Sequence, residues 1–145
     1  MYDQELLKKK VEAGFVTCHN DSCQQREHCR RWLGRVYEDP HPLVCQYVSM
    51  SNPAVGGPHC PMFRSDEKVR MAVGFTRLLS QLPRSQGNDL MAWMKAECHR
   101  TYAYEYRNGT RPIPPSLQQR IADRCRQLGW EQPVEFDRYY EEYEW

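Results

Sequence analysis

The sequence predicts a mainly α fold: a small helical domain with a metal-stapled, loop-rich N-terminal half and at most a short strand pair. Three observations lead to this fold class. Five of the seven cysteines and four of the five histidines fall within residues 18–60. Leu, Ile, Val and Phe together make up only 25 of 145 residues, which is few for an ordinary apolar core. After residue 64, apolar side chains recur at the spacing of amphipathic helices.

In the N-terminal half, Asp3 is a suitable N-cap for a short amphipathic helix. Regular structure beyond it is sparse, and Asp39-Pro-His-Pro42 breaks the second helix. We expect, in chain order, a helix over residues 3–12, a loop over 14–23, a helix over 24–36, a strand-like run over 43–50 and a turn-rich loop over 52–61.

The C-terminal half carries three longer helical patterns. One starts near Ser65 and continues through Leu79, and a second covers residues 88–107. A third begins at Pro115, because proline is well suited to the first turn of a helix. A last short helix is expected over residues 134–143.

A length of 145 residues fits one domain. We therefore expect a single domain over residues 1–145, with a cysteine-rich metal-binding part at 18–60 and a helical part at 64–145. The N-terminus lacks the apolar run of a signal peptide, and no segment approaches the roughly 18 apolar residues of a membrane span. These observations favour a cytoplasmic protein without membrane contact, whose thiols stay reduced and available to a metal.

The irregular cysteine spacing leaves the nature of the site open. Four thiolates around one zinc ion form a closed, structural site, and the same four thiolates suit a 4Fe-4S cluster. Zinc is favoured over the cluster, and a third interpretation is that the cysteines are reduced core residues. His19, His28 and His59 lie beside or near cysteines, so one of them is able to replace a thiolate. A hydrogen bond to a ligand is the commoner role of such a histidine.

Several motifs along the chain carry a resemblance to a known family. They are Cys18-His-Asn-Asp-Ser-Cys23, Cys29-Arg-Arg31, Cys60-Pro-Met-Phe-Arg-Ser65, Val69-Arg-Met-Ala-Val-Gly-Phe75, Tyr106-Arg-Asn-Gly-Thr-Arg111 and Phe136-Asp-Arg-Tyr. From about residue 15 to the end, the chain resembles an uncharacterised family of small cysteine-rich proteins from Bacteroidetes, a domain of unknown function. The resemblance implies that the metal ligands are Cys18, Cys23, Cys29 and Cys60. It leaves Cys45 as a core thiol or spare ligand, and it implies no activity.

Charge is distributed unevenly along the chain. Residues 61–130 hold twelve basic and six acidic side chains, whereas residues 131–145 hold one basic and six acidic ones. The favoured interpretation is that the acidic tail packs across the basic helices and neutralises them. The alternative is a nucleic-acid-binding surface in which basic side chains meet phosphates. The arginines of that surface would be Arg100, Arg107, Arg111, Arg120 and Arg124.

The sequence contains no phosphate-cradling glycine loop and no nucleophile elbow. Cys98 and His99 are adjacent on a predicted helix, about 100° apart, which does not suit a nucleophile and its base. The sequence therefore favours a protein that is not an enzyme. We expect a small cytoplasmic zinc protein that acts as an interaction module for an unknown protein partner. The alternatives are a nucleic-acid-binding regulator and an iron–sulfur protein.

Overall fold

Asp3 begins the first helix of the computed structural model, which describes residues 2–145. Its carboxylate accepts a hydrogen bond of 3.0 Å from the backbone N–H of Leu6, in the first turn of α1 (Gln4–Glu12). Capping of this kind stabilises a helix by about 1 kcal/mol. Leu7 buries its side chain completely, and Gly14, at a φ of 101°, turns the chain away after the helix. The helix predicted at the N-terminus is confirmed.

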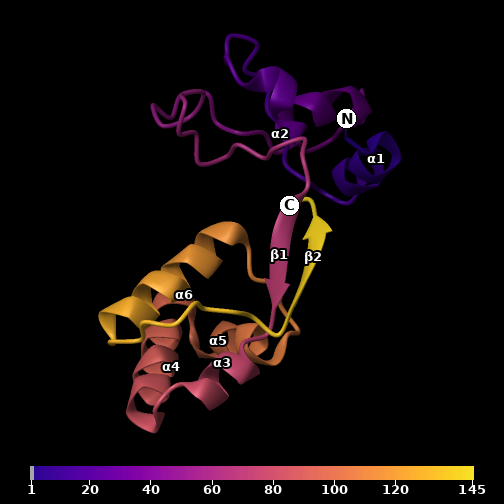
Figure 1. Cartoon of the computed structure of the whole chain (residues 1–145). Helices are drawn as coiled ribbons and strands as arrows, with labels where there is room; N and C mark the ends of the chain where they lie inside the picture. The colour runs from indigo at the N-terminus through magenta and orange to yellow at the C-terminus, as the bar shows by residue number, and fades with distance from the viewer. Residues whose placement is uncertain (1) are drawn as a thin grey trace. The chain divides into compact units, whose positions relative to one another are not determined.

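The chain divides into two compact units. The N-terminal unit contains the described residues up to Lys68 together with Tyr143–Trp145, and the C-terminal unit is Val69–Glu142. Helices α1 and α2 in Figure 1 belong to the N-terminal unit, and β1, β2 and helices α3 to α6 belong to the C-terminal unit. The expected single domain over residues 1–145 stays a prediction.

Short helical turns and loops make up most of the N-terminal unit. After α1 come the 3₁₀ helix η1 (Arg26–His28), α2 (Arg30–Leu33) and the 3₁₀ helix η2 (Gly34–Tyr37). Helix η2 packs closely on α1 because Gly34 has no side chain: a Cβ atom there would lie 2.9 Å from Cγ2 of Val11. In the described chain, the strand-like run predicted over residues 43–50 forms only one bridge, between Tyr47 and Thr17.

Two buried arginines connect the separate segments of the N-terminal unit. Arg30 is only 1% exposed. Its Nε donates a 2.6 Å hydrogen bond to the carbonyl oxygen of Ser65, and its Nη2 donates to that of Glu144. The guanidinium lies over the rings of Trp145 and Tyr143, 4.0 and 4.6 Å from their centroids. Arginine suits such a site because its charge is delocalised, weakly hydrated and able to stack on aromatic faces.

Arg31 makes equivalent contacts to a second set of segments and is also buried. Its Nε donates to the carbonyl oxygen of Met62 at 2.9 Å, and its Nη1 donates to that of Val16 at 2.7 Å. The guanidinium lies 4.6 Å from the ring centroid of Phe15. Hydrogen bonds to charged groups each contribute about 1.5–3 kcal/mol. The two arginines of α2 therefore hold together stretches of chain that have little regular structure of their own.

The prediction of a metal-stapled N-terminal half was wrong. Within residues 2–145, no three His, Cys, Asp or Glu side chains are arranged so that they could hold a metal ion. The guanidinium groups of Arg30 and Arg31 connect the segments that the metal was expected to connect. The described chain instead contains six α-helices and a two-stranded antiparallel sheet.

The sheet opens the C-terminal unit. Strand β1 (Val69–Val73) pairs with β2 (Arg138–Glu142), with Met71 opposite Tyr140, and the two strands lie side by side in Figure 1. The helix predicted from Ser65 through Leu79 is therefore wrong as far as residue 73, and the helix predicted over residues 134–143 is wrong because the chain forms β2 there. Valine and tyrosine favour a pleated surface, and pairs across the two strands stabilise it.

Four helices lie between the strands in sequence. They are α3 (Thr76–Gln81), α4 (Arg84–Cys98), α5 (Arg100–Asn108) and α6 (Pro115–Gln127). Pro115 starts α6 as predicted. The helix predicted over residues 88–107 is broken at His99, whose φ of 73° is rare for a residue with a side chain. Its Nδ1 accepts a hydrogen bond of 3.4 Å from the N–H of Thr101, so His99 caps α5.

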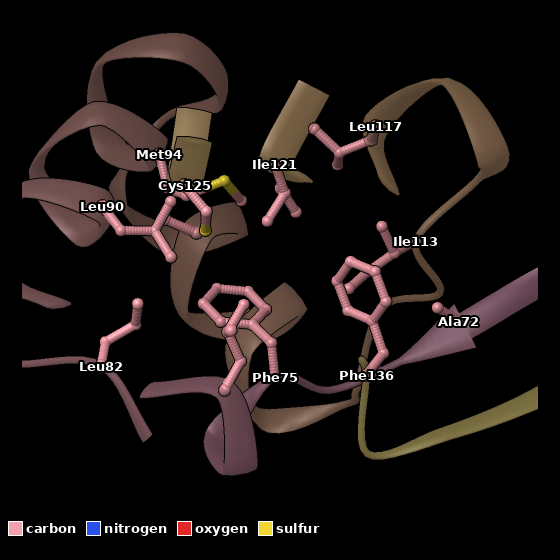
Figure 2. Close-up of a cluster of buried hydrophobic side chains, with 12 residues drawn as sticks. Ala72, Phe75, Leu82, Leu90, Met94, Ile113, Leu117, Ile121, Cys125 and Phe136 are labelled. Carbon is pink, nitrogen blue, oxygen red and sulfur yellow. The ribbon is translucent and has the colours of Figure 1, made fainter. Parts of the chain in front are cut away.

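A cluster of buried apolar side chains forms the core of the C-terminal unit. Figure 2 shows these side chains converging from β1, from the helices and from the segment that precedes β2. Phe75, Leu90 and Ile121 are completely buried in this cluster. Cys125 lies in it as well, and burial raises the pKa of its thiol to about 11. A thiol in such surroundings is an inert core side chain.

Candidate functional site

The four cysteines that the resemblance implies as ligands meet in the N-terminal unit. All four line one cavity of about 20 Å³, which is room for roughly one water-sized particle. The cavity walls between the thiols are largely apolar. The lining cysteines are Cys18, Cys23, Cys29 and Cys60, and the apolar side chains around them include Trp32, Val55, Met62 and Phe63.

Backbone hydrogen bonds position Cys18 and Cys29 on either side of α2. The N–H of Cys18 donates to the carbonyl oxygen of Arg31 at 2.9 Å, directly after the buried Thr17. Cys29 separates η1 from α2 and forms an isolated antiparallel bridge with Ser65. This bridge brings the segment that follows Cys60 alongside α2.

Turns position Cys23 and Cys60. The N–H of Cys23 donates to the carbonyl oxygen of Asn20 at 3.2 Å, and that of Cys60 donates to Gly57 at 3.1 Å. Cys23 therefore lies before the helical turns and not on one continuous helix with Cys29, in agreement with the loop predicted over residues 14–23. On such a helix the two thiols would point to different sides.

The four thiols are close enough to influence one another electrostatically. Burial raises the pKa of Cys18, a hydrogen bond with the backbone of Asn20 lowers it, and the charges of the other three thiols raise it further. Arg26 and Arg31 both line the same cavity and bring positive charge to it. Burial and the charge of Arg64 lower the pKa of Arg31, while the thiolates of Cys29, Cys18 and Cys60 raise it.

The other suggested ligands have different surroundings. His19 Nε2 lies 2.9 Å from a carboxylate oxygen of Glu38, and His28 Nδ1 lies 3.3 Å from one of Asp66. Neither histidine lines the cysteine cavity, nor does His59, in the described chain. Cys45 is exposed and lines a different cavity.

The five arginines of the predicted nucleic-acid surface fall into two groups. Arg111 forms a 2.7 Å ion pair with Glu105, and Arg120 pairs with Glu97. The acidic partners of these two arginines therefore lie on α5 and α4. Acidic partners in the C-terminal tail had been expected from the sequence.

The second group of arginines has no such acidic partner in the described chain. Arg100 and Arg107 lie 5.9 and 4.6 Å from the ring centroid of Tyr104. Lys95 is 5.0 Å from the same ring. Arg124 donates a 3.2 Å hydrogen bond to Gln127. The structure thus brings two of the five predicted arginines around one partly buried aromatic ring.

A second cavity in the N-terminal unit was not predicted from the sequence. It has a volume of about 720 Å³ and is lined by residues 11–17 and 37–47. At its edge, a carboxylate oxygen of Glu38 accepts hydrogen bonds from Thr17 Oγ1 and His19 Nε2. Asp39-Pro-His-Pro42 had been interpreted only as a helix terminator, so nothing in the sequence pattern indicated that this segment forms a cavity wall.

Each helix of the described residues is too short or too polar to cross a membrane. No curated protein and no solved structure matches the chain. A family model for a family of unknown function, DUF6078, matches residues 1–145. The chain therefore belongs to the DUF6078 family.

Proposed function

We propose that this protein binds a thiophilic metal through Cys18, Cys23, Cys29 and Cys60, with zinc favoured and a 4Fe-4S cluster as the alternative. One observation carries the proposal: four cysteines from separate turns of the chain line one small cavity. The four residues span more than forty positions, so local structure alone does not bring them together. Isolated backbone hydrogen bonds and those of Arg31 to the carbonyl oxygens of Met62 and Val16 link their segments.

The surroundings of the thiols support metal binding. Bound thiolates are deprotonated, and the guanidinium of Arg31 interacts favourably with three of them. Burial acts in the opposite direction and raises the pKa of Cys18, so metal binding would have to displace its proton. Largely apolar walls lower the local dielectric constant and strengthen attraction between thiolates and a cation. The thiols line the cavity without being in ligand geometry, so they would have to turn towards a common point when metal binds. Four thiolates would leave no open coordination position, so the site would not be catalytic.

We further propose that the protein acts in the cytoplasm as an interaction module, and that its family is the cysteine-rich Bacteroidetes family that the motifs resemble. All seven cysteines are free thiols, which suits a reducing compartment. Leu43 and Val44 in the N-terminal unit are almost fully exposed. Exposed apolar side chains that lie together mark contact sites for other proteins.

Metal analysis of the purified full-length protein tests the proposal. We expect about one zinc ion per chain, or iron with inorganic sulfide and broad visible absorption if the site holds a cluster. Cys18→Ser and Cys60→Ser should each lose most of the metal. Cys45→Ser is the matched control, because Cys45 is an exposed thiol of the same unit outside the cavity. Metal-free protein that takes up neither zinc nor iron would refute the proposal.

A second candidate, nucleic-acid binding, is favoured by the surface around Tyr104. Basic side chains surround this ring. A hydrogen bond from Lys95 and the positive charge of that side chain lower the pKa of the Tyr104 hydroxyl. A partly exposed ring among cations is able to stack on a base while the cations meet phosphates. Binding of a single-stranded oligonucleotide should then weaken steeply with salt. Retention that Tyr104→Ala and Arg107→Ala leave unchanged would exclude this surface.

A further inference from the structure

The larger cavity of the N-terminal unit is an open groove whose two walls come from different segments of the chain. One wall comes from the end of α1 and the turn after it, residues 11–17, and the other from the segment 37–47. Its volume of about 720 Å³ is within the range of sites that hold a ligand the size of a few side chains. Thr17 and Tyr47 join the two walls through an isolated parallel bridge.

The charge of the groove has one sign. Glu12, Glu38 and Asp39 line it, and no lysine or arginine does so in the described chain. Glu38 is held in place, because Thr17 Oγ1 and His19 Nε2 donate hydrogen bonds to its carboxylate. Asp39 is held by a 2.9 Å hydrogen bond from the N–H of His41. A preoriented pair of neighbouring carboxylates favours a cationic occupant.

Besides the carboxylates and the polar side chains of Thr17 and Gln46, the lining is apolar or aromatic. Phe15, Tyr37 and Tyr47 contribute aromatic wall. Val44, which lines the groove, is 86% exposed, and Leu43 beside it in the sequence is fully exposed. A metal ion alone would leave the apolar and aromatic surfaces of the groove uncovered. A nucleic acid is negatively charged and would be repelled by the three carboxylates. A long side chain with an aliphatic stem and a charged end, flanked by apolar residues, matches both walls.

We propose that this groove binds a peptide segment of a partner protein that carries an arginine or lysine between apolar residues. The cationic group lies at Glu38 and Asp39, and the flanking apolar side chains pack on Val44 and Tyr47. This inference rests on the interaction role proposed above and specifies the chemistry of the partner. It does not depend on the metal, because the groove and the cysteine cavity have different linings.

Fluorescence polarisation with a labelled peptide, acetyl-Ala-Leu-Arg-Leu-Ala-amide, tests the groove on the full-length protein. The matched probe replaces arginine with citrulline, which keeps the shape and removes the charge. We expect the arginine peptide to bind about tenfold more tightly, as the loss of a hydrogen bond to a charged group predicts. Equal binding of the two peptides, or binding of neither, would overturn the proposal.

Two variants locate the site. Glu38→Gln should weaken binding of the arginine peptide about tenfold, whereas the control Glu27→Gln, an exposed carboxylate outside the groove, should leave it unchanged. Val44→Ser should weaken both peptides by a few fold, since it removes apolar contact on an exposed rim that folding does not need.

Other outcomes separate this inference from the interaction role and from the metal site. If phage-displayed peptides selected on the protein lack basic residues and bind Glu38→Gln equally well, the interaction role survives and this groove assignment fails. If the protein self-associates and Glu38→Gln abolishes this association, the groove binds a second copy of the chain. That result would overturn the proposal of a partner peptide. Metal content measured on the same sample reports on the cysteine site alone.

Discussion

In the C-terminal unit, buried apolar side chains form one continuous cluster, whereas the largest fully buried side chain of the N-terminal unit, Arg30, is charged. The first arrangement depends on volume and close packing. The second depends on directional hydrogen bonds and on the faces of Tyr143 and Trp145. The two units hold nearly equal numbers of aliphatic residues, but the buried apolar cluster draws only on those of the C-terminal unit, and guanidinium groups stabilise the N-terminal unit.

Removing a large core side chain should have the largest effect. Phe75 is completely buried in the apolar cluster of the C-terminal unit, and Phe75→Ala should lower the free energy of unfolding by about 3–5 kcal/mol. Urea unfolding followed by circular dichroism measures this loss. Tyr102→Ala, on an exposed aromatic side chain of the same unit, is the control and should cost much less. Equal losses for the two variants would contradict the assignment of the core.

Replacing the buried arginine should destabilise the N-terminal unit. Arg30→Met removes the donor to the carbonyl oxygens of Ser65 and Glu144 and should cost about 2–3 kcal/mol. Arg30→Lys should be nearly as damaging, since a point charge cannot stack and donate in the same geometry. Hydrogen exchange of amides in residues 62–68 should quicken in both variants and not in Arg26→Lys, at a partly exposed arginine. If the amides of residues 62–68 exchange as slowly in Arg30→Lys as in the unaltered protein, a positive charge alone is sufficient to stabilise the N-terminal unit.

The smallest predicted effect concerns the start of α3. Asp137 accepts hydrogen bonds from the N–H groups of Thr76 and Arg77 at 3.0 and 2.9 Å. Burial raises the pKa of Asp137, but the hydrogen bonds from Arg77 and Thr76 outweigh it and lower the pKa below its usual value. The resulting stability is present above the unfolded-state pKa and is lost as the pH falls through the folded-state pKa. Asp137→Asn should cost about 1 kcal/mol at neutral pH.

Urea unfolding at several pH values checks this prediction. The difference between Asp137→Asn and the unaltered protein should shrink in acid, because protonation removes the same charge that the substitution removes. Asp89→Asn, at an exposed carboxylate within α4, serves as the comparison. A difference between Asp137→Asn and the unaltered protein that stays constant from neutral to acid pH would contradict the capping role.

Local sequence signals predicted the elements that depend on local contacts. Asp3 and Pro115 marked the starts of α1 and α6 because capping and the fixed φ of proline act within one turn. The pairing of β1 with β2 joins segments about seventy residues apart, and the apolar residues of β1 also fit a helical period. Nothing in the sequence pattern therefore distinguished a strand from a helix over the residues of β1.

The candidate sites were predictable to different degrees. Cysteine spacing and the family resemblance indicated the four thiols of Cys18, Cys23, Cys29 and Cys60, and these four line one cavity in the structure. The burial of Arg30 and Arg31 was not predictable, because arginine is usually exposed and the stacking partners of Arg30 lie at the far end of the chain. The groove of residues 11–17 and 37–47 arises from loops, whose path no periodicity describes.

Hydrogen exchange with and without zinc tests the central proposal most directly, because the two units serve as each other's control. If Cys18, Cys23, Cys29 and Cys60 bind the ion, stoichiometric zinc should slow amide exchange around these residues and leave the helices of Val69–Glu142 unchanged. Cys45→Ser should respond as the unaltered protein does, and Cys60→Ser should not respond. Exchange that zinc leaves unaltered, or slows equally in both units, would contradict metal binding at the four cysteines.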